Sequence, residues 1–98
     1  SSMVLYNCGH PSNEKLSVDL VNNPNYDGAY FHRFSWLKDE EIGKLSHEWN
    51  WLVGWYKEPD DGKPKAIHYT EGGPWFKNYR HCEYGDIWKN YLAEMMKK

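Results

Sequence analysis

Hydrophobic residues near the C-terminus recur three or four positions apart. They are Tyr84, Ile87, Trp88, Tyr91, Leu92 and Met95. This spacing places them on one side of an α-helix, and Asp86 near the start with Lys97 and Lys98 at the end suits the helix dipole. The pattern predicts a helix over about residues 84 to 96. We expect it to pack Ile87, Trp88, Tyr91 and Leu92 onto short strands.

Shorter apolar runs predict those strands. Their sequences are SMVLYN, AYFHRFSWL and KAIHYT. Each is rich in β-branched or aromatic residues and borders polar or Gly/Pro-containing segments, so we expect strands near residues 2 to 7, 29 to 35 and 65 to 70. With the C-terminal helix, they indicate an α+β fold.

The segment EWNWLVGWY, residues 48 to 56, alternates. Trp49, Trp51, Val53 and Trp55 would lie on one side of a strand, and Asn50, Leu52, Gly54 and Tyr56 on the other. A strand along the segment and a loop at Trp49 and Asn50 that leads into a shorter strand are both compatible with the pattern.

Polar residues predict the remaining short elements. Ser17 is an expected N-cap of a short helix that Pro24 limits, and Asp39 an expected cap of a helical turn that reaches Ile42. The polar segment EPDDGKPK, residues 58 to 65, predicts a turn between two strands.

Length and charge limit the class of protein. With 98 residues the chain is one domain at most, and a piece of a larger domain is plausible. Its formal net charge is -2, without the basic stripe that nucleic-acid binding requires. Its mean hydropathy of -0.94 predicts no membrane span.

The chain has two cysteines, Cys8 and Cys82, which are too few for a disulfide framework. We therefore expect a reducing, cytoplasmic location.

Aromatic residues make up 17% of the chain, with six tryptophans, so some rings should reach a cleft or an interface.

Two pairs of residues, Cys8 with His10 and His81 with Cys82, could supply the ligands of a zinc site. Neither pair has the usual spacing of zinc ligands, so a buried thiol beside a turn histidine is the preferred interpretation.

The segment AIHYTEGGPWF, residues 66 to 76, holds the candidate chemistry. His68 ends a predicted strand, where an imidazole can bind a metal, and the backbone N–H groups of Gly72 and Gly73 can approach an anion closely. A hydrogen-bonded histidine at a strand end, followed by an ordinary turn, is the structural alternative.

Three segments together resemble glycosyltransferase family 8. IHYTEGGPWF is similar to the motif near the end of that family's catalytic domain, LSHEWNWLVG (45 to 54) to its Leu-Pro-x-x-Trp-Asn segment, and SSMVLYN (1 to 7) to a strand that usually reads Phe-Asn-x-Gly-Val. The chain also resembles the C-terminal portion of uncharacterised bacterial and phage proteins with an HYT-x-GGPWF segment. These likenesses imply the GT-A fold, of which this chain would be a part.

The resemblance implies a transferase that takes a sugar from a nucleotide-sugar donor and passes it to an acceptor that the sequence does not identify. His68 would bind a divalent metal, usually manganese, and Gly72 and Gly73 would contact the donor diphosphate. Trp49, Asn50 and Trp75 are candidates for the wall of the sugar or acceptor site, although tryptophans in small domains more often lie in the core.

Several features depart from the family. The chain contains no Asp-x-Asp motif, Ser46 replaces a proline, Gly73 replaces a lysine, and the loop before Pro74 is one residue shorter. We therefore expect residues 1 to 98 to be the C-terminal piece of a glycosyltransferase-like domain, inactive alone and able to form homo-oligomers through uncovered surface. The alternative is a non-catalytic carbohydrate-binding or protein-interaction module, built on the surplus aromatic residues.

Overall fold

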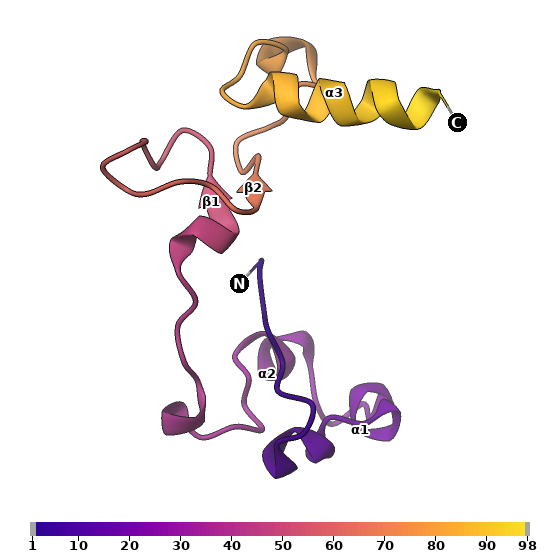
Figure 1. Ribbon diagram of the computed structural model, residues 1–98. Coiled ribbons are helices and arrows are strands. Elements are labelled where there is room, and N and C mark those ends of the chain that lie inside the picture. Colours follow the sequence, from indigo (N-terminus) through magenta and orange to yellow (C-terminus); the bar gives the residue numbers. More distant parts are fainter. Residues whose placement is uncertain (1, 98) are drawn as a thin grey trace. The chain divides into compact units, whose positions relative to one another are not determined.

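The computed structural model describes residues 2–97 and divides into two compact units, Ser1–Leu45 and Ser46–Lys98 (Figure 1). The first unit holds four short helical elements, and the second holds a two-stranded sheet and the longest helix. The secondary structure is thus a mixture of helices and strands. The partial GT-A fold and the single domain remain predictions.

In the first unit, the helical elements are η1 (Pro11–Lys15), α1 (Val18–Asn22), α2 (Gly28–His32) and η2 (Asp39–Glu41). The Ser17 hydroxyl accepts a hydrogen bond from the Leu20 backbone N–H, which confirms Ser17 as the N-cap of α1. The buried Trp36 donates from its indole N–H to Asn13 Oδ1 at 3.1 Å. The helical turn expected after Asp39 is also present, as η2.

Two of the predicted strands are wrong. Within the described residues, segment 2–7 forms no strand, and its unit offers no strand with which it could pair. The predicted strand 29–35 contains α2 instead, because the Asp27 carboxylate accepts from the Tyr30 N–H and caps a helix there. Phe34, at φ 56°, ends any regular extension of this segment.

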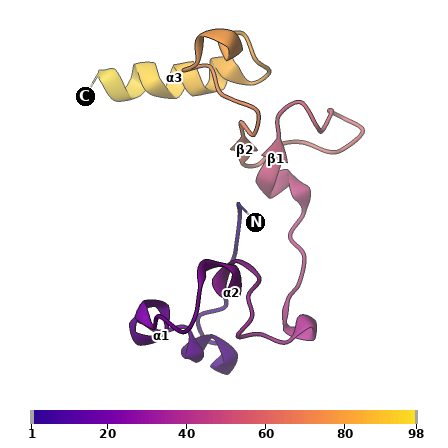
Figure 2. The same ribbon diagram turned by 180° about the vertical axis from the view of Figure 1, so that it is seen from behind.

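In the second unit, β1 (Trp51–Leu52) and β2 (Ile67–His68) form a parallel pair. They lie side by side in both views (Figures 1 and 2), with Leu52 opposite His68. The Trp51 N–H donates to Ala66 O at 2.8 Å, and the Val53 N–H donates to His68 O at 3.1 Å. Trp51 is 0% exposed and forms the centre of this unit's core.

Both strands are shorter than predicted. The segment 48–56 begins inside η3 (His47–Asn50), so the interpretation with Trp49 and Asn50 outside the strand is correct. After Leu52 the chain leaves the sheet through Gly54, whose φ of 89° is unfavourable for other residues. The expected strand 65–70 is reduced to β2 because only two register positions pair with β1.

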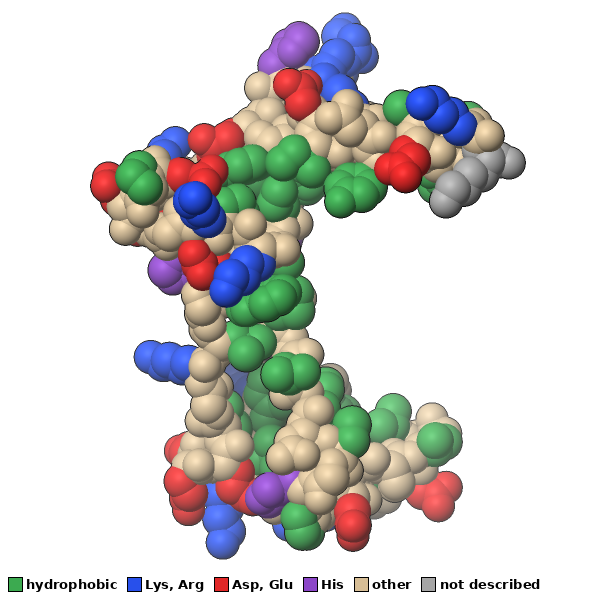
Figure 3. Space-filling view, in the orientation of Figure 1, with side chains coloured by type: hydrophobic (Ala, Val, Ile, Leu, Met, Phe, Trp, Pro, Cys, Tyr) green, Lys and Arg blue, Asp and Glu red, His purple; other side chains and the backbone are tan. Residues whose placement is uncertain are grey.

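The helix α3 (Gly85–Met96) confirms the predicted C-terminal helix. Trp88 packs on Trp75, with ring centroids 5.2 Å apart. The predicted apolar packing is wrong for Tyr91, which is 69% exposed, and for Ile87 and Leu92, which are exposed as well. Trp88 packs on a residue of the loop rather than on a strand. Figure 3 shows hydrophobic side chains gathered along one side of α3 and the loop before it, open to solvent. No helix in residues 2–97 has the length and apolar character needed to cross a membrane.

Candidate functional site

His68 and Asn50 form the centre of the predicted site. His68 is the last residue of β2, and Nδ1 of its ring lies 3.1 Å from Oδ1 of Asn50, the last residue of η3. The contact follows from the sheet register, since His68 pairs with Leu52 and Asn50 precedes Leu52 by two residues. Both side chains are half-buried.

This hydrogen bond fixes the chemistry of the imidazole. An amide oxygen only accepts, so Nδ1 of a neutral His68 ring carries the proton and Nε2 carries the lone pair. Metal-binding histidines are held in this way, through a hydrogen bond from the other ring nitrogen. Asn50, predicted as part of a sugar wall, thus orients the predicted metal ligand.

The two glycines after β2 have a packing role. A Cβ on Gly72 would lie 2.7 Å from the ring of Tyr79, and one on Gly73 would overlap the ring of Trp75. Gly72 also has a φ of 148°, which side chains disfavour. Glycine therefore lets both aromatic rings lie directly on the loop backbone.

The backbone N–H groups of Gly72 and Gly73 donate no hydrogen bond to any part of residues 2–97, although Gly73 is buried. Buried N–H groups in proteins are nearly always paired. These two donors are therefore compatible with the predicted contact to an anionic ligand.

The other predicted wall residues have partners elsewhere. Trp49 is half-exposed, and the Lys65 ammonium lies 5.4 Å from its ring centroid. Trp75 contacts Tyr69 and Trp88, at centroid distances of 5.6 and 5.2 Å, and so joins the loop to α3.

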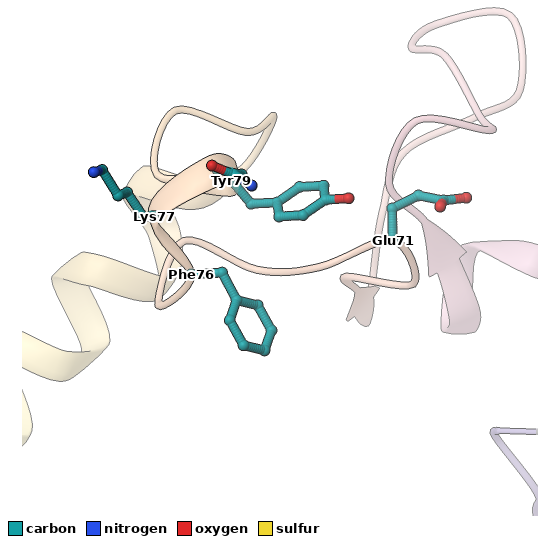
Figure 4. A pocket seen from close by; sticks show the side chains of 5 residues that line it. Glu71, Phe76, Lys77 and Tyr79 are labelled. Carbon is teal, nitrogen blue, oxygen red and sulfur yellow. The ribbon is translucent and has the colours of Figure 1, made fainter.

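A hollow of about 500 Å³ lies next to the glycine loop. It is lined by Glu71, Phe76, Lys77, Asn78 and Tyr79. Figure 4 shows the Tyr79 ring extending toward Glu71 and the Lys77 side chain pointing away from that ring. Of these residues, Glu71 and Phe76 belong to the segment AIHYTEGGPWF that the sequence singled out, and the other three lie beyond it. The short helix η4 (Lys77–Tyr79), which positions Tyr79, had no sequence signal.

Two tyrosine hydroxyls link Tyr84, the residue before α3, to earlier segments of the chain. The Tyr69 hydroxyl donates to Tyr84 O at 2.6 Å, and the Tyr84 hydroxyl donates to Glu58 Oε2 at 2.6 Å. Burial, the hydrogen bond to Glu58 and nearby negative charge raise the pKa of Tyr84 to about 12. The indole of Trp51 lowers this pKa slightly, although its buried N–H makes no hydrogen bond of regular geometry within the described residues.

For the predicted metal, the residues fit in part. His68 offers one ligand of suitable tautomer. No group of three or more His, Cys, Asp or Glu side chains in residues 2–97 is arranged to hold a metal ion. A complete set of ligands would therefore need oxygen atoms of a bound substrate or groups outside these residues.

Comparison with known proteins finds a relative in a plant. The chain is 51% identical, over 102 aligned residues, to Protein CDI of Arabidopsis thaliana. The match covers all of this chain and 38% of the relative, so the chain spans well under half of that protein's length. No protein-family model matches the chain. No solved structure matches it.

These findings overturn the identification with glycosyltransferase family 8. The whole chain aligns with a plant protein of another name, and no glycosyltransferase family model matches it. The likeness to bacterial and phage proteins is likewise unsupported.

Proposed function

We propose that this chain is part of an enzyme that transfers a sugar from a nucleotide-sugar donor with the help of a divalent metal, with manganese as the expected ion. The proposal rests on the site and not on membership of a family. The observation that carries it is the Asn50–His68 hydrogen bond at the end of β2, directly before the Gly72–Gly73 loop. Phosphate-containing ligands commonly bind beyond the carboxyl ends of parallel strands.

Each residue has a specific role in this proposal. Asn50 holds the His68 ring so that Nε2 carries the lone pair, and His68 supplies one metal ligand. The N–H groups of Gly72 and Gly73 donate to oxygen atoms of the donor diphosphate. When bound, a divalent cation would stabilise the negative charge that develops on the departing nucleoside diphosphate. We identify no general base among the described residues.

The broader setting of the protein is also proposed. Cys8 and Cys82 are free thiols, which supports the predicted cytoplasmic location, where thiols stay reduced. The exposed apolar residues of α3 support the predicted homo-oligomer or an interface with further chain.

A second candidate is a carbohydrate-binding module without catalysis. It is favoured by the solvent-open hollow beside Glu71 and by the exposure of Trp55, which is 66% accessible. A chain that binds a sugar but does not release nucleoside diphosphate from a nucleotide-sugar would be this module and not the transferase.

The test uses a chain that contains these 98 residues and is extended to the length of the Arabidopsis relative. Release of nucleoside diphosphate from a panel of UDP- and GDP-sugars is measured with and without Mn²⁺. We expect Mn²⁺-dependent release that falls by on the order of 100-fold in His68→Ala, because loss of a residue that only supports a metal ligand already costs about 10- to 100-fold. Release that is independent of both the metal and His68 would reject the proposal.

A further inference from the structure

The hollow beside the glycine loop has a size suited to a small organic ligand. Its volume of about 500 Å³ lies within the range of small-molecule sites. It begins at Glu71, three residues after His68, and ends at Tyr79 in η4. It therefore adjoins the proposed metal and diphosphate site along the same loop.

Two aromatic rings line the hollow. Tyr79 is 37% exposed and Phe76 is 55% exposed, so both present apolar surface to solvent. Aromatic rings open to solvent in a concave site are suited to ligands with an apolar face and polar edges. The Tyr79 ring is fixed against the backbone of Gly72, where no side chain could fit.

A carboxylate supplies the polar end of the hollow. Oε1 of Glu71 accepts a hydrogen bond from the Trp55 indole N–H at 3.0 Å, which orients the group. Oε2 of Glu71 accepts no hydrogen bond from any residue in the described range 2–97. An oriented carboxylate binds hydroxyl groups strongly, because hydrogen bonds to a charged acceptor are short and strong.

The charges of the lining indicate an uncharged ligand. Glu71 is negatively charged and the Lys77 side chain points away from the Tyr79 ring (Figure 4), so the hollow has no excess of positive charge to select a phosphate. An uncharged molecule with a C–H face and several hydroxyls matches both the rings and the carboxylate.

We propose that this hollow binds the pyranose ring of a sugar, with one C–H face on Tyr79 and hydroxyl groups on Glu71. This rests on the second candidate function, carbohydrate binding at this hollow, and names the residues that would hold the sugar. A sugar can occupy the hollow whether or not His68 binds a metal. The hollow also replaces Trp49, Asn50 and Trp75 as the sugar wall.

The test is a ¹⁵N NMR titration of the 98-residue chain with the methyl pyranosides of glucose, galactose, mannose and xylose, without metal. We expect at least one of them to cause saturable shifts of the amide signals of Gly72, Asn78 and Tyr79, with a Kd on the order of 1 mM. Tyr79→Ala should weaken this binding about tenfold, which corresponds to ~1.4 kcal/mol. Tyr79→Phe, which keeps the ring, should bind like the wild type.

Further variants make the result specific. Glu71→Gln keeps the shape of the hollow and should weaken binding several-fold. Tyr91→Ala, on the exposed side of α3, should leave the pyranoside shifts unchanged. The proposal is overturned if none of the four pyranosides gives saturable shifts, or if Glu71→Gln and Tyr79→Ala both bind like the wild type. Because no metal is present, this failure would leave the His68 proposal standing.

Discussion

The hydroxyl of Tyr84 donates a 2.6 Å hydrogen bond to Oε2 of Glu58, 26 residues earlier in the chain. The bond ties the polar turn before Gly62 to the residue that precedes α3. Tyr84 itself adopts a left-handed backbone conformation, with φ 62° and ψ 7°. The start of the helix is thus fixed by a side chain contact rather than by a capping residue.

This contact predicts a loss of stability at high pH. The folded-state pKa of Tyr84, about 12, lies above the ordinary value of 10.0, because burial and the bond to Glu58 disfavour the phenolate. The stability that the protonated Tyr84 hydroxyl contributes is complete below about pH 10, and it is lost as the pH rises through the folded-state pKa of about 12. Urea unfolding between pH 8 and 12 measures it.

The matched variant is Tyr84→Phe, which should lower the free energy of unfolding by about 1–2 kcal/mol at pH 8, because Glu58 loses its donor. The difference from the wild type should shrink toward pH 12. Equal differences at both ends of this pH range would show that the hydroxyl does not carry the effect.

Trp51 and Trp55 should respond very differently to truncation. Trp51 is fully buried against Tyr56, with ring centroids 5.5 Å apart, and Trp51→Ala should destabilise the second unit by about 3–5 kcal/mol. Trp55→Ala removes a mostly exposed ring and should cost under about 1 kcal/mol. Chemical denaturation followed by far-UV circular dichroism measures both, and similar losses would contradict this description of the core.

Gly72 should not tolerate a side chain. Gly72→Ala combines a φ of 148° with contact against the Tyr79 ring, and we expect a loss of about 1–3 kcal/mol. Gly43→Ala is the control, because nothing lies within 4 Å of a Cβ placed there and its φ is not in the positive region. If thermal melts of the two variants coincide, the close packing of Tyr79 on the loop is incorrect.

Local sequence signals predicted some elements well. The Ser17 cap identified α1, and the helical spacing from Tyr84 onward identified α3. The sequence failed where a weak local preference depended on distant partners. The aromatic run around Phe31 has strand propensity, but the Asp27 cap made it helical.

The site was predictable only in part, for a related reason. His68 and the glycines stood out because of their residue types and positions. Asn50 is 18 residues away from His68, and its role depends on the register of a two-residue parallel pair. The hollow depends on how Tyr79 folds back onto Gly72, which no spacing rule indicates.

The exposed side of α3 predicts self-association of the 98-residue chain. Tyr91, Met95 and Ile87 present apolar surface that water disfavours. Light scattering over a concentration series should show dimers or larger species, and the double variant Tyr91→Lys, Met95→Lys should reduce them because its added charges repel. A wild-type chain that stays monomeric at high concentration would contradict the prediction.

The most direct test of His68 as a metal ligand is the broadening of histidine ring signals in the ¹H NMR spectrum by substoichiometric Mn²⁺. The chain has five histidines, so His10, His32, His47 and His81 serve as internal controls. We predict that His68 broadens first, that Asn50→Asp keeps this preference because it retains an acceptor for Nδ1–H, and that Asn50→Ala loses it. His68→Ala should hardly change the melting temperature. Broadening of His68 no stronger than that of the other histidines, together with a loss of about 1–3 kcal/mol of stability in His68→Ala, would show instead that the histidine is structural.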